Sequence, residues 1–88
     1  MIGALRGVIL EKTAGEVVVD VGGVGYRVVV STLQSQKLGP PGETVSLRIQ
    51  TMVREDAITL YGFTAREEET LFLMLISVSN VGPQSNRA

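Results

Sequence analysis

The strongest constraint on the fold is a pair of β-branched runs, residues 16–21 and 24–31, separated by two glycines. Apolar residues alternate along both runs and fall on one face of each: Val17, Val19, Val21, Val24, Tyr26, Val28 and Val30. This period of two is typical of half-buried strands. Gly22 and Gly23 suit a tight reversal, whereas a phosphate-binding glycine loop would have to open a helix. The sequence therefore predicts a β-hairpin in which these glycines serve the turn.

Three further runs have strand character: residues 2–11, 44–51 and 57–63. Gly7 lacks a side chain and is the expected place of a bulge or bend in the first of them. The connector at residues 31–43 can form one short helical turn before its Gly-Pro-Pro-Gly sequence ends it. Five strands with a short helix between the third and the fourth fit a mainly β Greek-key barrel of the OB type over residues 1–63. A five-stranded SH3-like barrel is the alternative.

The hydrophobic period changes from that of a strand to that of a helix at Thr64. Thr64 and Glu67 match a capping box, in which each side chain bonds to the backbone N–H of the other residue. Glu67, Glu68 and Glu69 are expected to form a solvated helix start, where the helix dipole favours negative charge. The apolar stripe that follows is broad enough to be buried: Leu71, Phe72, Met74, Leu75, Ile76 and Val78.

The same helix is expected to end within residues 77–84. Pro83 blocks its continuation, and Asn80 or Gly82 can take the left-handed angles of a tight turn. A helix followed by such a turn is half of a helix-hairpin-helix unit. Residues 64–88 are therefore predicted to be the first helix and the hairpin of an incomplete helix-hairpin-helix domain.

Composition excludes several kinds of chemistry. The chain has no cysteine and no histidine, so disulfides, thiolate sites and histidine-based metal or catalytic sites are excluded. No segment approaches the roughly 18 apolar residues that a membrane span needs, and the first ten residues lack the apolar core of an export signal. We therefore expect a soluble, cytoplasmic protein with no membrane partner. Its net charge of −1 lacks the basic excess that is usual in nucleic-acid-binding proteins.

A charged tip, Arg54, Glu55 and Asp56, lies between the last two predicted strands. By composition alone it is an ordinary exposed hairpin turn. A metal site or a general acid–base pair would need a further ligand or a water-positioning partner, and no third group is spaced to supply one. The sequence therefore predicts no metal, no cofactor and no catalytic residue, and the chain is not expected to be an enzyme.

Four stretches, in this order and spacing, resemble the N-terminal part of the RuvA family, the Holliday-junction-binding subunits of the bacterial branch-migration complex. They read MIGALRGVILE, GGVGYRV, REDAITLYGF and SNVGP. The resemblance implies a non-catalytic subunit of DNA recombination and repair, including the SOS response to DNA damage. Its OB barrel would form homotetramers, or octamers, on four-way junction DNA. The ATPase motor RuvB would be engaged only through C-terminal regions that this sequence does not contain.

The resemblance also implies roles for particular residues. Glu55 and Asp56 would form an acidic pin at the junction crossover, where negative charge beside phosphates disfavours stacking of the arms. Contacts to the DNA backbone are implied for Arg54, Asn80, Val81, Gly82 and Gln84. Family members usually have glycine at the first hairpin position and lysine at the last. Gln84 therefore removes one positive charge, which lowers the expected salt dependence of binding.

Two functions from different classes fit this sequence. The first is a structure-selective, junction-binding subunit that tetramerises through its barrel. The alternative is an assembly module that keeps the barrel and forms oligomers but has little affinity for DNA. The net charge of −1 and the missing second hairpin support the alternative.

Overall fold

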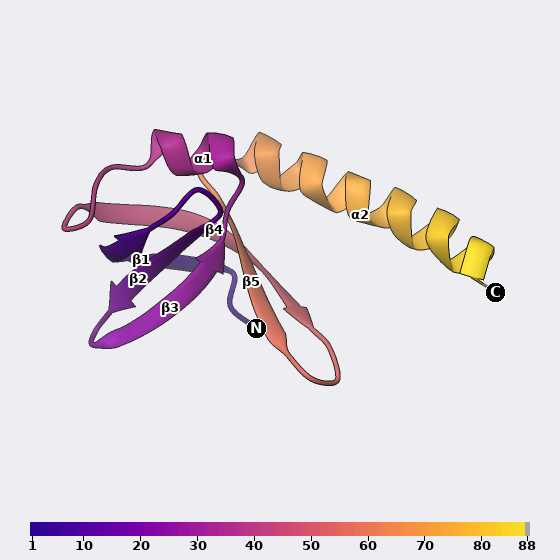
Figure 1. The fold of residues 1–88 in the computed structure, drawn as a ribbon, viewed down its shortest axis with the longest axis horizontal. Helices are drawn as coiled ribbons and strands as arrows, with labels where there is room; N and C mark the ends of the chain where they lie inside the picture. The colour runs from indigo at the N-terminus through magenta and orange to yellow at the C-terminus, as the bar shows by residue number, and fades with distance from the viewer. Residues whose placement is uncertain (88) are drawn as a thin grey trace.

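A computed structural model describes residues 1–87, with side chains described as far as Ser77. The elements are β1 (Ala4–Lys12), β2 (Glu16–Val21), β3 (Val24–Val29), α1 (Thr32–Lys37), β4 (Thr44–Val53), β5 (Ile58–Phe63) and α2 (Arg66–Arg87). The strands close into a barrel in the order β1-β2-β3-β5-β4 (Figure 1). Only β3 and β5 run parallel, and the other neighbours are antiparallel. This order, with α1 between β3 and β4, confirms the OB-type barrel.

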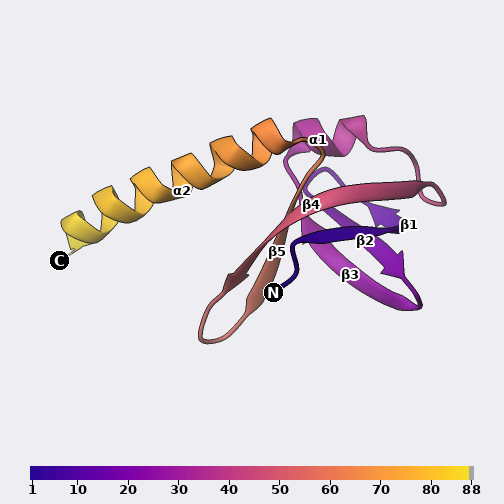
Figure 2. The same cartoon turned by 180° about the vertical axis from the view of Figure 1, so that it is seen from behind.

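The barrel interior is filled by alternating residues of the five strands, by Val30 just after β3 and by Leu38 just after α1. The buried apolar side chains of this core are Leu5, Ile9, Val17, Val19, Val28, Val30, Leu38, Leu47, Ile49 and Leu60, and Phe63 is buried as well. Val24 differs from the prediction, because it pairs with Val21 at the turn end of the β2–β3 ladder and is exposed. The view from behind shows α1 at one end of the barrel and the β4–β5 loop beyond the other (Figure 2).

The two-glycine turn between β2 and β3 forms as predicted. Gly22 and Gly23 have φ angles of 60° and 95°, which are left-handed values that glycine adopts without a steric penalty. The Asp20 carboxylate accepts a hydrogen bond from the Gly23 N–H at 2.9 Å. The glycines therefore serve a hairpin, and no helix follows them.

The irregularity in β1 lies further along than the sequence predicts. The register of the β1–β2 ladder shifts between Ile9 and Glu11, and Gly7 is not part of it. Gly7 has another role: a Cβ at this position would overlap the Asp20 carbonyl of β2. The missing side chain permits close backbone approach, which is the other common reason for a glycine in a strand.

Helix α2 begins one residue later than the proposed capping box implies. Its first residue is Arg66, so Glu68 rather than Glu67 occupies the third helical position. The Glu68 carboxylate accepts a hydrogen bond from the Thr64 hydroxyl at 2.8 Å. The predicted capping box is therefore wrong: the Thr64 hydroxyl bonds a side chain, and the Thr64 N–H donates to Gln34 instead of Glu67.

The predicted helix end within residues 77–84 is wrong for the backbone, because α2 runs to Arg87. Pro83 removes one bond of the helical ladder, but elongation of a helix that is already formed is cooperative and competes with such local stop signals. The predicted burial is also wrong for three members of the apolar stripe. Leu71, Met74 and Leu75 are each more than half exposed, since among the described residues the barrel covers only the side of α2 that carries Phe72. The side chain of Val78 lies outside the described residues.

Among residues 1–87, no helix is long and apolar enough to cross a membrane.

Candidate nucleic-acid interface

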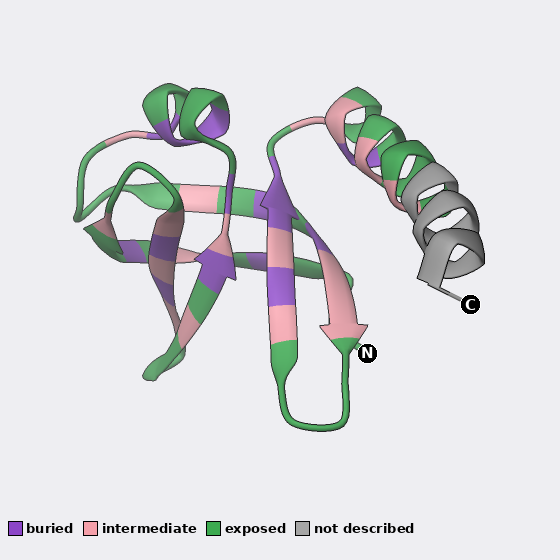
Figure 3. Cartoon of the chain, turned by 45° about the vertical axis from the view of Figure 1, so that its right-hand side comes forward, coloured by how far each residue is buried: buried purple, intermediate pink, exposed green. Residues whose placement is uncertain are grey.

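The β4–β5 hairpin carries the predicted charged tip away from the body of the barrel (Figure 3). Val53 and Ile58 form the last strand pair. Beyond them the Arg54 N–H donates to the Ala57 carbonyl at 2.8 Å, which closes a tight loop. Every residue from Val53 to Ile58 is exposed. The structure therefore places Arg54, Glu55 and Asp56 together at the outer end of a protruding hairpin.

The tip side chains have no polar partner in the described part of the chain. No hydrogen bond and no ion pair involves the guanidinium of Arg54 or the carboxylates of Glu55 and Asp56. Among the described residues, no group of three acidic, histidine or cysteine side chains is arranged to hold a metal ion. An exposed carboxylate repels a nearby phosphate, whereas an arginine such as Arg54 attracts one.

An apolar pair lies directly behind the charged tip, and sequence reasoning did not single it out. Val53 is 59% exposed and Ile58 is 69% exposed. Both continue the alternating patterns of their strands, but here the hairpin has left the barrel and no core lies beneath it. Strand periodicity alone could not show this, because it gives the face of a residue and not what covers that face.

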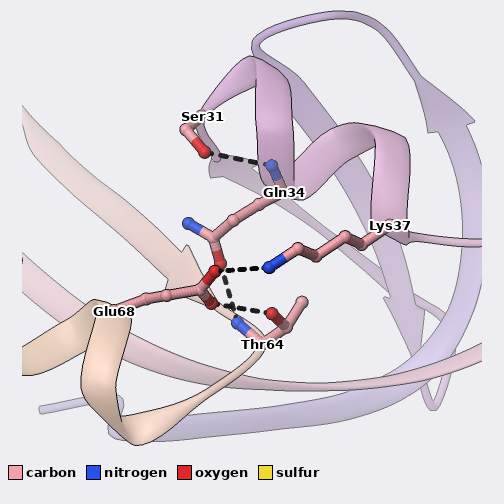
Figure 4. A network of polar contacts seen from close by, with 5 residues as sticks. All are labelled: Ser31, Gln34, Lys37, Thr64 and Glu68. Atoms are coloured by element: carbon pink, nitrogen blue, oxygen red, sulfur yellow. Dashed lines mark hydrogen bonds and ion pairs between the residues drawn. The ribbon is translucent and has the colours of Figure 1, made fainter.

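A polar network joins the start of α2 to α1 (Figure 4). Ser31 caps α1 by accepting from the Gln34 N–H at 3.1 Å. The Gln34 side chain, only 5% exposed, accepts from the Thr64 N–H at 2.7 Å. Lys37 donates to Glu68 at 2.9 Å. These contacts fix the direction in which α2 leaves the barrel.

Glu69 forms a second connection, between α2 and β4. It is 8% exposed and accepts from the Arg48 Nε at 2.6 Å and from the Gln50 side-chain amide at 2.7 Å. The prediction of a solvated helix start is therefore right for Glu67, which is exposed, and wrong for Glu69. Its partners lie 21 and 19 residues away in the sequence, so no local pattern indicates them.

Both connecting carboxylates are held in their charged form. The hydrogen bond from Lys37 is the main cause that lowers the pKa of Glu68, and the bond from Thr64 adds to it. The hydrogen bond from Arg48 is the main cause that lowers the pKa of Glu69, followed by the bond from Gln50. Hydrogen bonds and nearby positive charge stabilise the carboxylate over the acid, against the opposing effect of burial.

An aromatic cluster completes the attachment of α2. Phe72 lies between Tyr61 and Phe63 of β5, with both ring centroids 5.0 Å from its own in tilted geometry. Such pairs stabilise by about 0.5–1.5 kcal/mol beyond the apolar area that they bury. Phe72 is therefore a member of the predicted apolar stripe that does pack against the barrel.

The predicted hairpin residues Asn80, Val81, Gly82 and Gln84 lie in the distal part of α2, and their side chains are outside the described residues. Their contact with DNA stays a prediction. The structure therefore tests the placement of Arg54, Glu55 and Asp56 but not that of these four residues.

Comparison with known proteins gives one consistent family. Residues 1–62 match the family model described as the RuvA N terminal domain. Relatives called "Holliday junction branch migration complex subunit RuvA" include one from Myxococcus xanthus (strain DK1622), 52% identical over 96% of this chain and 42% of the relative. Another, from Thermomicrobium roseum (strain ATCC 27502 / DSM 5159 / P-2), is 50% identical over 96% of this chain and 44% of the relative. The chain thus spans less than half the length of these relatives, and it belongs to the RuvA N-terminal domain family.

Proposed function

We propose that this chain is a non-catalytic DNA-binding subunit that tetramerises through its barrel and addresses four-way junctions with the tip formed by Glu55 and Asp56. The observation that carries the proposal is the protruding hairpin, which ends in two exposed carboxylates that have no polar partner among the described residues. Family membership supports it, since the relatives are named as subunits of a Holliday junction branch migration complex. As a corollary, residues 64–88 would open a helix-hairpin-helix domain.

The tip would act by electrostatic repulsion. Four copies around a junction centre would bring together eight carboxylates, two from each Glu55 and Asp56 pair. A carboxylate about 7 Å from a phosphate is repelled by about 0.6 kcal/mol in bulk water. Summed over several such pairs, this disfavours stacked arms that crowd phosphates at the crossover. The Debye length of about 8–10 Å at moderate salt confines the effect to the centre.

Attraction to DNA would have to come from other residues. Arg54 lies beside the acids and can contact a phosphate of the strand that they repel. Asn80, Val81, Gly82 and Gln84 would approach the backbone further out, in the manner that the family resemblance implies. Contacts of both kinds are independent of base sequence, so the subunit would distinguish a four-way junction from linear duplex by its shape.

The decisive variant combines Glu55→Gln and Asp56→Asn, which removes the charge but keeps the size of both side chains. We expect it to bind linear duplex as well as the wild type or better, and to lose the preference for a four-way junction. Fluorescence anisotropy with both substrates measures the preference, and energy transfer between labelled arms measures the opening. The matched control is Glu11→Gln with Glu67→Gln, two exposed acids away from the tip. Equal junction preference and arm opening in the tip variant and this control would contradict the proposed role.

The second candidate is an assembly module with little DNA affinity. It is favoured by the exposed apolar side chains of Leu71, Met74 and Leu75 on α2 and by the net charge of −1. Sedimentation of the 88-residue chain at low salt, with and without a four-way junction, separates the two. Oligomers that do not bind the junction would favour the assembly module, whereas co-sedimentation with the junction would exclude it.

A further inference from the structure

The barrel has a second surface feature that none of the proposed roles uses. A cavity of about 480 Å³ opens where the outer face of the β1–β4 ladder meets the start of α2. Three arginines line it, Arg6 from β1, Arg48 from β4 and Arg66 from the first position of α2. They are three of only eight basic residues in the chain. A chain with a net charge of −1 therefore concentrates much of its positive charge in one hollow.

The register of the ladder produces this arrangement. Ala4 lies opposite Arg48, and Arg6 lies opposite Ser46. Directly paired residues and their diagonal neighbours at a spacing of two share one face of a sheet. The two arginines therefore stand diagonally, and the small side chains of Ala4 and Ser46 leave space between them. The α2 residue Arg66 borders that space from a third side.

The three guanidinium groups are not equally engaged. Arg48 donates through its Nε to Glu69, and its terminal nitrogens take part in no hydrogen bond among the described residues. Arg6 and Arg66 take part in no ion pair within the described residues, and both are exposed. Glu69 is already held by Arg48 and Gln50. Even when the charge of Glu69 is counted, the hollow keeps a net charge of about two positive units.

We propose that this hollow binds a phosphate group of the DNA backbone, so that the barrel itself contacts one strand of a junction arm. A guanidinium group presents a planar fork of donors that matches two phosphate oxygens, and it stays charged at any physiological pH. None of these groups reads a base, so binding here is independent of sequence.

The position of the hollow relative to the tip favours DNA as the occupant. Arg48 lies five residues before Val53 on the same strand, which is roughly 17 Å at the usual rise of a β-strand. A phosphate bound in the hollow would therefore belong to a junction arm, just outside the crossover from which Glu55 and Asp56 repel phosphates. Repulsion at the tip and attraction at the hollow would then act on the same DNA strand. This inference rests on the proposed junction-binding function.

The test uses the 88-residue chain with Arg6→Gln and Arg66→Gln, alone and together. Arg48 is left intact because it holds Glu69. The control is Arg27→Gln, which removes one exposed arginine that pairs with Glu16 on another part of the barrel. Binding to a four-way junction and to linear duplex is measured by anisotropy from low to moderate salt. We expect the double variant to bind both substrates about three- to tenfold more weakly at low salt, with a salt slope smaller by about one.

The outcomes separate this inference from the function on which it rests. Equal affinity and equal salt slope in the double variant and in Arg27→Gln would overturn the phosphate site and leave the role of the tip standing. Loss of junction preference only in the tip variant, with weaker binding only in the arginine variant, supports both. A wild-type chain that binds no DNA at low salt overturns both.

A protein occupant is the remaining possibility, and the same variants exclude or establish it. If Arg6→Gln with Arg66→Gln changes the sedimentation of the chain in the absence of DNA, the hollow receives a carboxylate of a second copy and the assignment to DNA is wrong. Thermal unfolding shows whether the variants are folded. We expect midpoints close to that of the wild type, because both side chains are exposed.

Discussion

Two adjacent pairs of acidic residues, Glu55–Asp56 and Glu68–Glu69, occupy opposite environments in this small protein. The first pair lies at a hairpin tip, exposed and without polar partners among the described residues. The second pair lies at the start of α2 and is bonded to Lys37, Thr64, Arg48 and Gln50. Partnered carboxylates contribute to stability, whereas unpartnered ones leave their charge available to act on another molecule.

The bonded pair, Glu68 and Glu69, helps to orient α2 relative to the barrel. Glu68 and Glu69 attach the first turn of α2 to α1 and to β4, and Phe72 attaches the next turn to β5. The direction of α2 relative to the tip is therefore set by side chains within the chain. If the distal part of α2 contacts DNA, this attachment determines where along an arm the contact falls.

The largest expected effect on stability is that of Glu69→Ala. It leaves Arg48 and Gln50 without their partner, and we expect a loss of about 1–2 kcal/mol, since Arg48 is half exposed and water recovers part of the cost. Urea denaturation followed by circular dichroism measures it. The control, Glu67→Ala, removes an exposed acid from the same turn and should change stability by about 0.5 kcal/mol or less. A similar effect of the two variants would mean that the buried pair does not hold α2.

The pH dependence of stability should come from the same pair. Bonding to Lys37 and Arg48 holds the pKa of Glu68 and Glu69 below the ordinary value of 4.5. The unfolded chain therefore takes up protons first as the pH falls, so stability is full above about pH 4.5 and decreases below it. Thermal unfolding from pH 7 to pH 3 measures the loss. The Glu68→Gln, Glu69→Gln variant should lose less stability over the same range, and an equal loss would assign the acid sensitivity to other groups.

A smaller effect is expected from Lys37→Ala. The Lys37–Glu68 pair spans 2.9 Å, but the lysine side chain is half exposed. Exposed pairs of this kind contribute about 0.2–1 kcal/mol and are screened by salt. The measurement is the unfolding midpoint in low and in high salt, where the difference between variant and wild type should shrink. A difference that is independent of salt would point to lost packing of the lysine stem instead.

The barrel could be predicted from the sequence because its determinants are local. Alternation along Val17, Val19 and the later strands gave the core face, and the glycine pair gave the β2–β3 turn. These patterns operate over a few residues and are read directly from composition and period. The charged tip was located for the same reason, since it interrupts two alternating runs.

What the sequence did not predict depends on contacts between distant segments. The burial of Glu69 requires Arg48 and Gln50 from β4, and the arginine hollow requires the register that sets Ala4 opposite Arg48. The role of Gly7 depends on the approach of the Asp20 carbonyl. The exposure of Leu71, Met74 and Leu75 depends on what covers α2, which a helical period cannot show.

The smallest effect on stability is expected for the tip carboxylates, Glu55 and Asp56. Replacement of Glu55 and Asp56 by Gln and Asn should change the free energy of unfolding by no more than about 0.5 kcal/mol, because both side chains are exposed and lose no polar contact with the described residues. Urea denaturation of the tip variant and of Glu69→Ala under the same conditions measures both free energies of unfolding. A loss as large as that of Glu69→Ala would mean that the tip carboxylates stabilise the hairpin itself. A stable tip variant whose junction preference is altered would separate folding from function within a single hairpin.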